Sequence, residues 1–132
     1  MKTLIVEDDF ASRVLMHELL KGYSTSIHVA VNGKEAVAAV CMAIETGEPY
    51  DLICLDIIMP EMNGQEALRE IREQEESKGI PSPQGAKIVM ITALGDVQNV
   101  GAAYHNLCDA YLTKPIEKSK LIAKLRELNL ID

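Results

Sequence analysis

The chain has 132 residues and a mass of 14.5 kDa, which is the usual size of one domain. Hydrophobic residues make up 48% and charged residues 25% of the sequence, a balance that favours a packed core over disorder. Thirteen Lys and Arg against twenty Asp and Glu give a net charge of −7 without any basic run, so nucleic acid and anionic membranes are poor partners.

Targeting and redox signals are weak in this sequence. The longest apolar run, residues 36–44, is far shorter than the roughly 18 residues of a membrane span. The apolar run at the N-terminus stops at Glu7, too early for a signal peptide. We therefore expect a cytoplasmic protein with one domain over residues 1–132 and no output domain. Cys41, Cys54 and Cys108 are odd in number and widely spaced, and two of them sit inside apolar stretches, which favours buried free thiols over a disulfide or a zinc site.

Five segments have the hydrophobic pattern of strands. In chain order they are residues 4–6, 26–31, 52–55, 88–91 and 110–112. The first, third and fourth are continuous apolar runs, which are typical of central strands covered on both faces. Residues 26–31 alternate, with Ile27, Val29 and Val31 on one side, and the fifth segment is short. Both are therefore predicted to be edge strands.

Between these segments the apolar residues recur with a helical period. The predicted helices lie around residues 10–20, 36–44, 67–71, 97–104 and 121–128. Asn32 with Glu35, and Asn63 with Glu66, have the spacing of a capping box at the starts of the second and third helices. The polar stretch 74–85, with two glycines and two prolines, predicts a frayed helix end followed by a loop.

Strict alternation of strands and helices predicts an α/β fold with helices on both faces of a parallel sheet. With the second and fifth strands at the edges, the strand order is 2-1-3-4-5, the flavodoxin-like doubly wound arrangement with five βα units. In such a sheet the ligand site lies beyond the carboxyl ends of strands 1 and 3.

Polar residues stand at the carboxyl ends of four predicted strands. They are Glu7, Asp8 and Asp9 after the first, Asp56 after the third, Thr92 after the fourth, and Lys114 two residues beyond the fifth. Each alone has an ordinary explanation, such as a helix N-terminus, a turn or a solvated charge. Their convergence on one sheet edge predicts a site.

Carboxylates held close together repel one another, so such a cluster raises one pKa or collects a cation. Oxygen ligands select a hard cation, and a few carboxylates with water suit Mg²⁺ better than Ca²⁺. With Mg²⁺ and Lys114 to neutralise its surroundings, Asp56 could attack phosphorus and become an aspartyl phosphate. Thr92 could then hydrogen-bond a phosphoryl oxygen.

Four ordered segments carry a resemblance to a known family. Residues 4–9, 51–64, 91–93 and 111–115 resemble the four blocks of a response-regulator receiver domain of the CheY-like type, which functions in two-component signalling. The resemblance runs from about residue 2 to residue 128.

The resemblance implies a role for each site residue. Asp56 matches the phosphoacceptor, Asp8 a direct Mg²⁺ ligand, Glu7 an acid that acts on the metal largely through water, and Ile58 a main-chain carbonyl ligand. Thr92 and Lys114 match the switch hydroxyl and the phosphoryl-binding lysine. Members of this family usually have a pair of acids directly after the first strand. Here that pair is Glu7 and Asp8 if the first segment is aligned on Val6, or Asp8 and Asp9 if the alignment is offset by one residue.

Three further positions follow from the same resemblance. Tyr111 matches the aromatic residue that rotates on activation, although an aromatic side chain on an edge strand can equally be a packing residue. Gly64 matches a loop position where a side chain is unwelcome. The Lys114–Pro115 peptide bond is predicted to be cis.

The function implied is a phosphorylation-dependent switch that is not an enzyme beyond its own phosphoryl transfer and autodephosphorylation. It would take its phosphoryl group from a histidine kinase or phosphotransfer protein, and signal by protein contact through the fourth helix, fifth strand and fifth helix. One alternative is a Mg²⁺-dependent aspartyl-phosphate phosphohydrolase, although such enzymes usually place the nucleophile after the first strand. Another alternative is a receiver-like binding module that is never phosphorylated.

Overall fold

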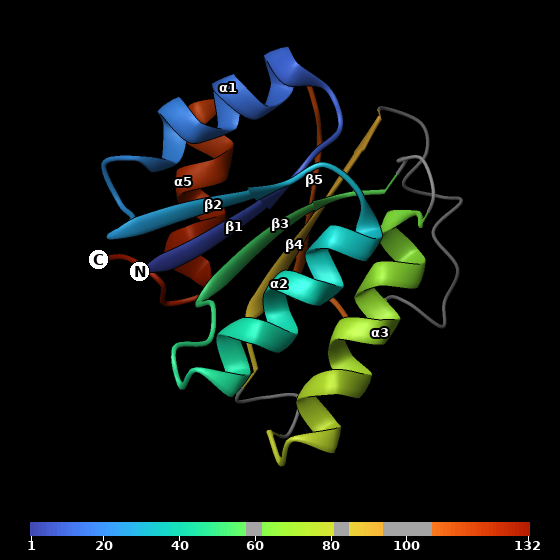
Figure 1. Cartoon of the computed structure of the whole chain (residues 1–132). Coiled ribbons are helices and arrows are strands. Elements are labelled where there is room, and N and C mark those ends of the chain that lie inside the picture. The colour runs from blue at the N-terminus through green and yellow to red at the C-terminus, as the bar shows by residue number, and fades with distance from the viewer. Residues whose placement is uncertain (58–61, 81–84, 94–106) are drawn as a thin grey trace.

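The computed structural model describes residues 1–57, 62–80, 85–93 and 107–132 (Figure 1). Its elements are β1 (Lys2–Val6), α1 (Phe10–Leu20), β2 (Ser26–Ala30), α2 (Gly33–Glu45), β3 (Leu52–Asp56), α3 (Gly64–Ser77), β4 (Lys87–Ala93), β5 (Ala110–Lys114) and α5 (Lys118–Glu127). The predicted fourth helix, residues 97–104, lies outside the described residues. No described helix has the length and apolar content that a membrane span requires.

The five strands form one parallel sheet in the order β2-β1-β3-β4-β5, as the sequence predicts. The register aligns the carboxyl ends of the central strands. Val6 pairs with Leu55 and Asp56 pairs with Ile91, so the chain leaves β1, β3 and β4 at the same edge of the sheet. Residues far apart in sequence are thereby brought together at one edge.

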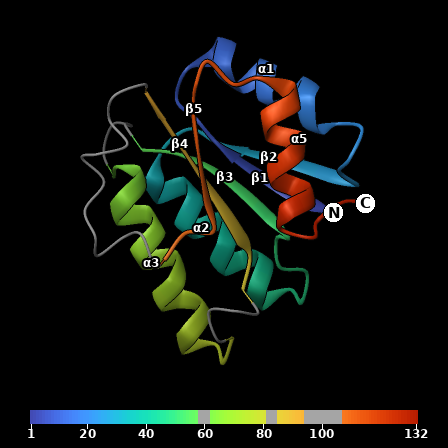
Figure 2. The ribbon, with the colours of Figure 1, turned by 180° about the vertical axis from the view of Figure 1, so that it is seen from behind.

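Helices cover both faces of the sheet (Figures 1 and 2). On one face α2 and α3 pack against alternate strand residues, including the buried Leu4, Ile53 and Ile88. On the other face α1 and α5 pack against the residues between them, including the buried Ile5 and Cys54. The central strands are therefore apolar throughout because each of their faces contributes to a separate core.

The edge strand β2 differs from its predicted pattern. Ile27 packs against the core beside α1 and α5, but Val29 and Val31 are 47% and 37% exposed, while Ala30 between them is fully buried. An edge strand is covered less completely by helices than a central strand. The alternation of apolar and polar residues along it therefore does not determine which of its faces is buried. The prediction of edge position is confirmed, and the apolar side is only partly buried.

Local signals placed the helix starts correctly. Asn32 and Asn63 are the N-caps of α2 and α3, and their side chains accept hydrogen bonds from the backbone N–H groups of Glu35 and Glu66 at 2.8 and 2.9 Å. The polar stretch 74–85 contains the end of α3, as predicted, although the helix stays regular as far as Ser77.

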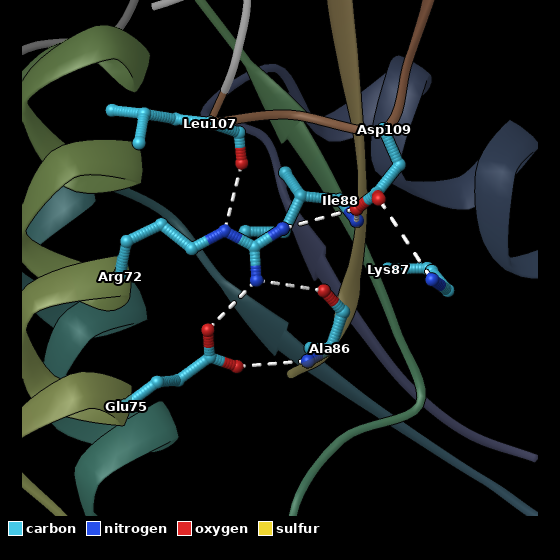
Figure 3. A network of polar contacts seen from close by, with 7 residues as sticks. All are labelled: Arg72, Glu75, Ala86, Lys87, Ile88, Leu107 and Asp109. Carbon is cyan, nitrogen blue, oxygen red and sulfur yellow. Dashed lines mark hydrogen bonds and ion pairs between the residues drawn. The ribbon is translucent and has the colours of Figure 1, made fainter. Parts of the chain in front are cut away.

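The end of α3 is held by a buried polar network, which Figure 3 shows. The Arg72 guanidinium donates to a Glu75 carboxylate oxygen at 2.7 Å and to the Asp109 carboxylate at 3.0 Å. It also donates to the carbonyl oxygens of Leu107 at 2.7 Å and Ala86 at 2.9 Å. One side chain therefore joins α3 to the segments that lead into β4 and β5.

The two acids of this network are themselves held by backbone groups. Glu75 accepts from the N–H of Ala86 at 2.8 Å, and Asp109 accepts from the N–H of Ile88 at 2.8 Å. The side chains of Arg72 and Glu75 are only 8% and 4% exposed. A buried ion pair with this many hydrogen bonds tolerates its desolvation, but removal of one partner leaves a buried charge unpaired.

The three cysteines are free thiols, as predicted. The prediction that they are buried is correct for Cys54 and wrong for Cys41 and Cys108, which are half-buried. Burial raises the pKa of the Cys54 thiol to about 12, so it stays protonated at neutral pH.

We predict that Arg72→Met lowers the free energy of unfolding by about 3 kcal/mol or more, because Glu75 and Asp109 lose their shared cation. The matched control is Arg69→Met, one turn earlier, whose ion pair with Glu73 is 66% and 64% exposed and is worth at most about 0.5 kcal/mol. Urea denaturation followed by circular dichroism measures both. Equal losses in the two variants would contradict a structural role for the network.

Candidate functional site

Three carboxylates from two neighbouring strands meet at the carboxyl edge of the sheet. Glu7 and Asp8 directly follow β1, and Asp56 is the last residue of β3. One oxygen from each of the three carboxylates lies within 4.8 Å of the others. Glu7 and Asp56 are buried and Asp8 is exposed, so the cluster opens to solvent on one side.

Lys114 supplies the positive charge beside this cluster. It is the last residue of β5, and its ammonium lies 3.1 Å from a Glu7 carboxylate oxygen and 3.3 Å from an Asp56 carboxylate oxygen. The Lys114–Pro115 peptide bond that follows is cis, as predicted. Lys114 thus bridges the two buried acids, although 107 and 58 residues separate it from them.

The electrostatics of the site follow from this crowding. Burial, together with the nearby charge of Asp56, raises the pKa of Glu7 from its ordinary value to about 7. Burial alone would lower the pKa of Lys114, but its hydrogen bond to Glu7 and the charge of Asp56 outweigh that effect and raise it. A raised pKa at Glu7 is the response expected where carboxylates crowd together with only one ammonium beside them.

Asp9 has a different task from its two neighbours. It is the N-cap of α1, and one of its carboxylate oxygens accepts from the backbone N–H and the hydroxyl of Ser12 at 2.9 and 2.8 Å. The hydrogen bond from the Ser12 backbone, followed by that from its hydroxyl, lowers the pKa of Asp9. This geometry favours Glu7 and Asp8, rather than Asp8 and Asp9, as the acidic pair.

Arg13 was not singled out by sequence reasoning. Its guanidinium donates to the backbone carbonyls of Glu7 at 3.0 Å and Asp8 at 2.9 Å, and so fixes the turn that carries both acids. The signal was present in the sequence, since Arg13 lies one turn into the helix that begins just after the acids.

Gly64 begins α3 at a point of close backbone approach. Its N–H donates to the carbonyl of Ile57 at 2.8 Å, and a Cβ at this position would clash with the carbonyl oxygen of Asp56. No side chain fits there without moving the chain that carries Asp56. The expectation that a side chain is unwelcome at this position agrees with this geometry.

The remaining predicted residues are distributed around the same edge. Thr92 lies near the end of β4, one residue beyond the partner of Asp56, and is buried. Tyr111 lies on β5, where it packs against the core beside α2 and α3, and burial raises its pKa. Ile58, the expected carbonyl ligand, lies outside the described residues.

The chemistry of the donor set fits a hard divalent cation. All three side chains offer oxygen, one face is open for water, and the charge of the acids exceeds that of Lys114. Mg²⁺ is bound in proteins by one or two carboxylates with several waters rather than by a closed protein cage. The cluster therefore has the ligands that such an ion requires.

Comparison with known proteins places this geometry in a family. A family model described as the response regulator receiver domain matches residues 3–126. The chain belongs to the response regulator receiver domain family. It is a receiver domain of two-component signalling, and the members of this family are signalling switches. The strand order and the cluster of acids at the carboxyl edge of the sheet agree with this family.

Individual relatives agree with the assignment. Hybrid signal transduction histidine kinase B of Dictyostelium discoideum is 36% identical over 129 residues, which cover 94% of this chain and 6% of the kinase. Two-component response regulator 24 of Arabidopsis thaliana is 33% identical over 126 residues, which cover 96% of this chain and 82% of that protein. The receiver domain therefore occurs both as a small part of long kinases and as most of a short regulator.

Among solved structures, the receiver domain of the histidine kinase CKI1 from Arabidopsis thaliana, complexed with Mg²⁺, is 30% identical to this chain. The two align with a TM-score of 0.73 over 96% of this chain and 90% of that domain. The resemblance to CheY-like receiver domains, stated above from sequence blocks, is thus confirmed in fold as well as in sequence.

We predict that Gly64→Ala lowers the free energy of unfolding by about 1 to 3 kcal/mol, because the methyl group forces the backbone at Asp56 to move. Gly22→Ala is the control, since a Cβ at that position meets no atom within 4 Å. Thermal and urea unfolding of the two variants provide the comparison. A Gly64→Ala protein as stable as Gly22→Ala would show that the close approach is not constraining.

Proposed function

We propose that this receiver domain accepts a phosphoryl group on Asp56 from a phosphohistidine donor, with Mg²⁺ bound by the neighbouring acids. The observation that supports this most strongly is the meeting of Glu7, Asp8 and Asp56 at the sheet edge, with the Lys114 ammonium in contact with Glu7 and Asp56. A phosphoryl group brings negative charge to its acceptor, so the acceptor needs cations around it.

The transfer is a substitution at phosphorus. An oxygen of the Asp56 carboxylate forms a bond to phosphorus while the bond from phosphorus to the donor imidazole nitrogen breaks, and the imidazole leaves with the bonding electron pair. The product is an aspartyl phosphate. The same carboxylate can take the group from acetyl phosphate, in which case a P–O bond breaks and acetate leaves.

Each residue of the site has a task in this proposal. Glu7 and Asp8 would hold Mg²⁺, which when bound offsets the charge of the phosphoryl oxygens. Lys114, already in contact with Asp56, would pair with a phosphoryl oxygen as that group arrives. Thr92, buried near the end of β4, would donate its hydroxyl to another phosphoryl oxygen and so sense the modification.

Signalling would then follow from a shift between two conformations of the domain. Thr92 on β4 and Tyr111 on β5 lie on adjacent strands, so a hydroxyl drawn toward the phosphoryl group changes the space beside the tyrosine. In this proposal the donor is a histidine kinase or phosphotransfer protein, in a cytoplasmic setting. The output is a contact with another protein through the surface around β5 and α5.

We predict that acetyl phosphate with Mg²⁺ adds one phosphoryl group to the wild-type chain and none to Asp56→Asn, because the amide is not a nucleophile of comparable strength. Intact-mass spectrometry reads the result directly, and omission of Mg²⁺ should slow the labelling. Labelling of Asp56→Asn to the same extent would exclude Asp56 as the acceptor. Sustained turnover of a general phosphate ester by the wild type would instead favour a phosphohydrolase.

A second experiment distinguishes the roles of Asp8 and Asp9 in Mg²⁺ binding. We predict that Asp8→Asn weakens Mg²⁺ binding about tenfold or more, because it removes the exposed carboxylate of the cluster. Asp9→Asn should leave Mg²⁺ binding unchanged, because Asn also caps a helix N-terminus well.

Isothermal titration with Mg²⁺ measures both variants against the wild type. If Asp9→Asn loses the ion as Asp8→Asn does, the acidic pair is Asp8 and Asp9, and the assignment of Glu7 is wrong.

A further inference from the structure

A pocket of about 360 Å³ lies beside the carboxylate cluster, between α1 and the segment that joins β5 to α5. Both helices cover the same face of the sheet (Figure 2). The buried strand residues Ile5, Cys54 and Ile91 line the pocket from the sheet, and Leu15 and Ile116 line it from the opposite side. The volume falls within the range of pockets that hold small molecules.

The described residues leave this pocket open to solvent. Leu15 on α1 is 44% exposed although it lies beside buried apolar residues, and Pro115, which also lines the pocket, is exposed as well. An apolar group that entered the pocket would leave water together with the side chain of Leu15. The hydrophobic effect therefore favours an apolar occupant.

The Glu7–Lys114 ion pair forms the polar end of the pocket. Asp8 and Asp56 do not line the pocket, so this pair lies between it and the rest of the cluster. Among the described residues, the Lys114 ammonium contacts Glu7 at 3.1 Å and Asp56 at 3.3 Å, which engages two of its three N–H donors. The Glu7 carboxylate accepts from Lys114 and from the backbone N–H of Asp9, and has lone pairs for a further donor.

This ion pair discriminates among polar groups by their charge. A carboxylate on the occupant would face Glu7, in a chain whose net charge is −7, and an ammonium would face Lys114. In either case a charge would also leave water for a mainly apolar pocket. A hydroxyl group is neutral, and it can accept from Lys114 while it donates to Glu7. The ion pair is therefore complementary to a hydroxyl group.

We propose that this pocket binds a small neutral molecule with an aromatic or branched aliphatic body and one hydroxyl group. The body lies against Ile5, Cys54 and Ile91, and the hydroxyl lies on the Glu7–Lys114 pair. Apolar contact supplies the affinity and the hydroxyl fixes the orientation. Glu7 and Lys114 also belong to the phosphoryl-acceptor site, so an occupied pocket links a second input to the same switch. This link alone rests on the proposed function.

The test uses the full, unmodified chain and four probes that share a methyl-substituted benzene ring. They are 4-methylphenol, toluene, 4-methylbenzoate and 4-methylbenzylamine, which carry a hydroxyl, no polar group, an anion and a cation. NMR of the chain with ¹³C-labelled methionine and isoleucine methyl groups gives both the dissociation constant and the location. Met16 lines the pocket, and Met42, exposed on α2 across the sheet, is the internal control.

We expect 4-methylphenol to shift Met16 and Ile116 saturably, with a dissociation constant below about 1 mM, and to leave Met42 unchanged. Toluene should bind about threefold or more weakly, because the hydroxyl contacts are missing. The two charged probes should bind about tenfold or more weakly, because their charge is desolvated beside a like charge. This ranking depends on no variant.

Two neighbouring positions on α1 provide matched variants. Leu15→Asp places a charge at the rim of the pocket, and should weaken binding of 4-methylphenol about tenfold. Val14 is 46% exposed and does not line the pocket, so Val14→Asp should weaken binding less than about twofold for the same change in charge. Circular dichroism checks that both variants are folded.

Equal binding of all four probes, shifts confined to methyl groups outside the pocket, or an equal loss in the two variants would overturn the proposal. The link is measured by labelling Asp56 with acetyl phosphate, with and without saturating 4-methylphenol. We expect about a twofold or larger decrease in the labelling rate, because the hydroxyl occupies a donor of Lys114. An unchanged rate would refute the link. Binding of 4-methylphenol without any labelling of the wild type would refute the phosphoryl-acceptor function alone.

Discussion

Two buried carboxylates with one ammonium between them are the interaction around which this edge of the molecule is organised. Glu7 and Asp56 stand at the ends of neighbouring strands, and Lys114 approaches both from β5. Without that ammonium, two desolvated negative charges would face each other across the sheet edge. The balance is incomplete, and that residual negative charge makes the edge receptive to a further cation.

The rest of the fold keeps these groups in position. Parallel register brings the ends of β1, β3 and β4 to one edge, Arg13 fixes the turn after β1, and the absence of a side chain at Gly64 lets α3 start against Asp56. At the opposite ends of the strands, Arg72 joins α3 to the segments that lead into β4 and β5. The site therefore lies at the carboxyl ends of the strands, and this network at the amino ends of β4 and β5.

The sequence predicted the fold and most of the site because both depend on local signals. Strand ends can be read from apolar runs, and polar residues that follow them must converge in a parallel sheet. The Arg72 network could not be read in this way, since Asp109 is 37 residues distant. A signal did exist in the helix itself: Arg72 and Glu75 lie on the same face of α3 as the buried Leu68 and Ile71, where charged residues need partners. The exposure of Val29 depends on how far α1 extends over an edge strand, which no local pattern encodes.

The central claim is that the clustered acids direct phosphoryl transfer to one carboxylate. It is tested most directly by exposing the chain to phosphoramidate, whose P–N bond resembles that of phosphohistidine, and reducing the product with sodium borodeuteride. An acyl phosphate is reduced to deuterated homoserine, which peptide mass spectrometry can locate. We predict homoserine at position 56 only. Homoserine at position 8 or 9, or at several acids in similar amounts, would contradict it.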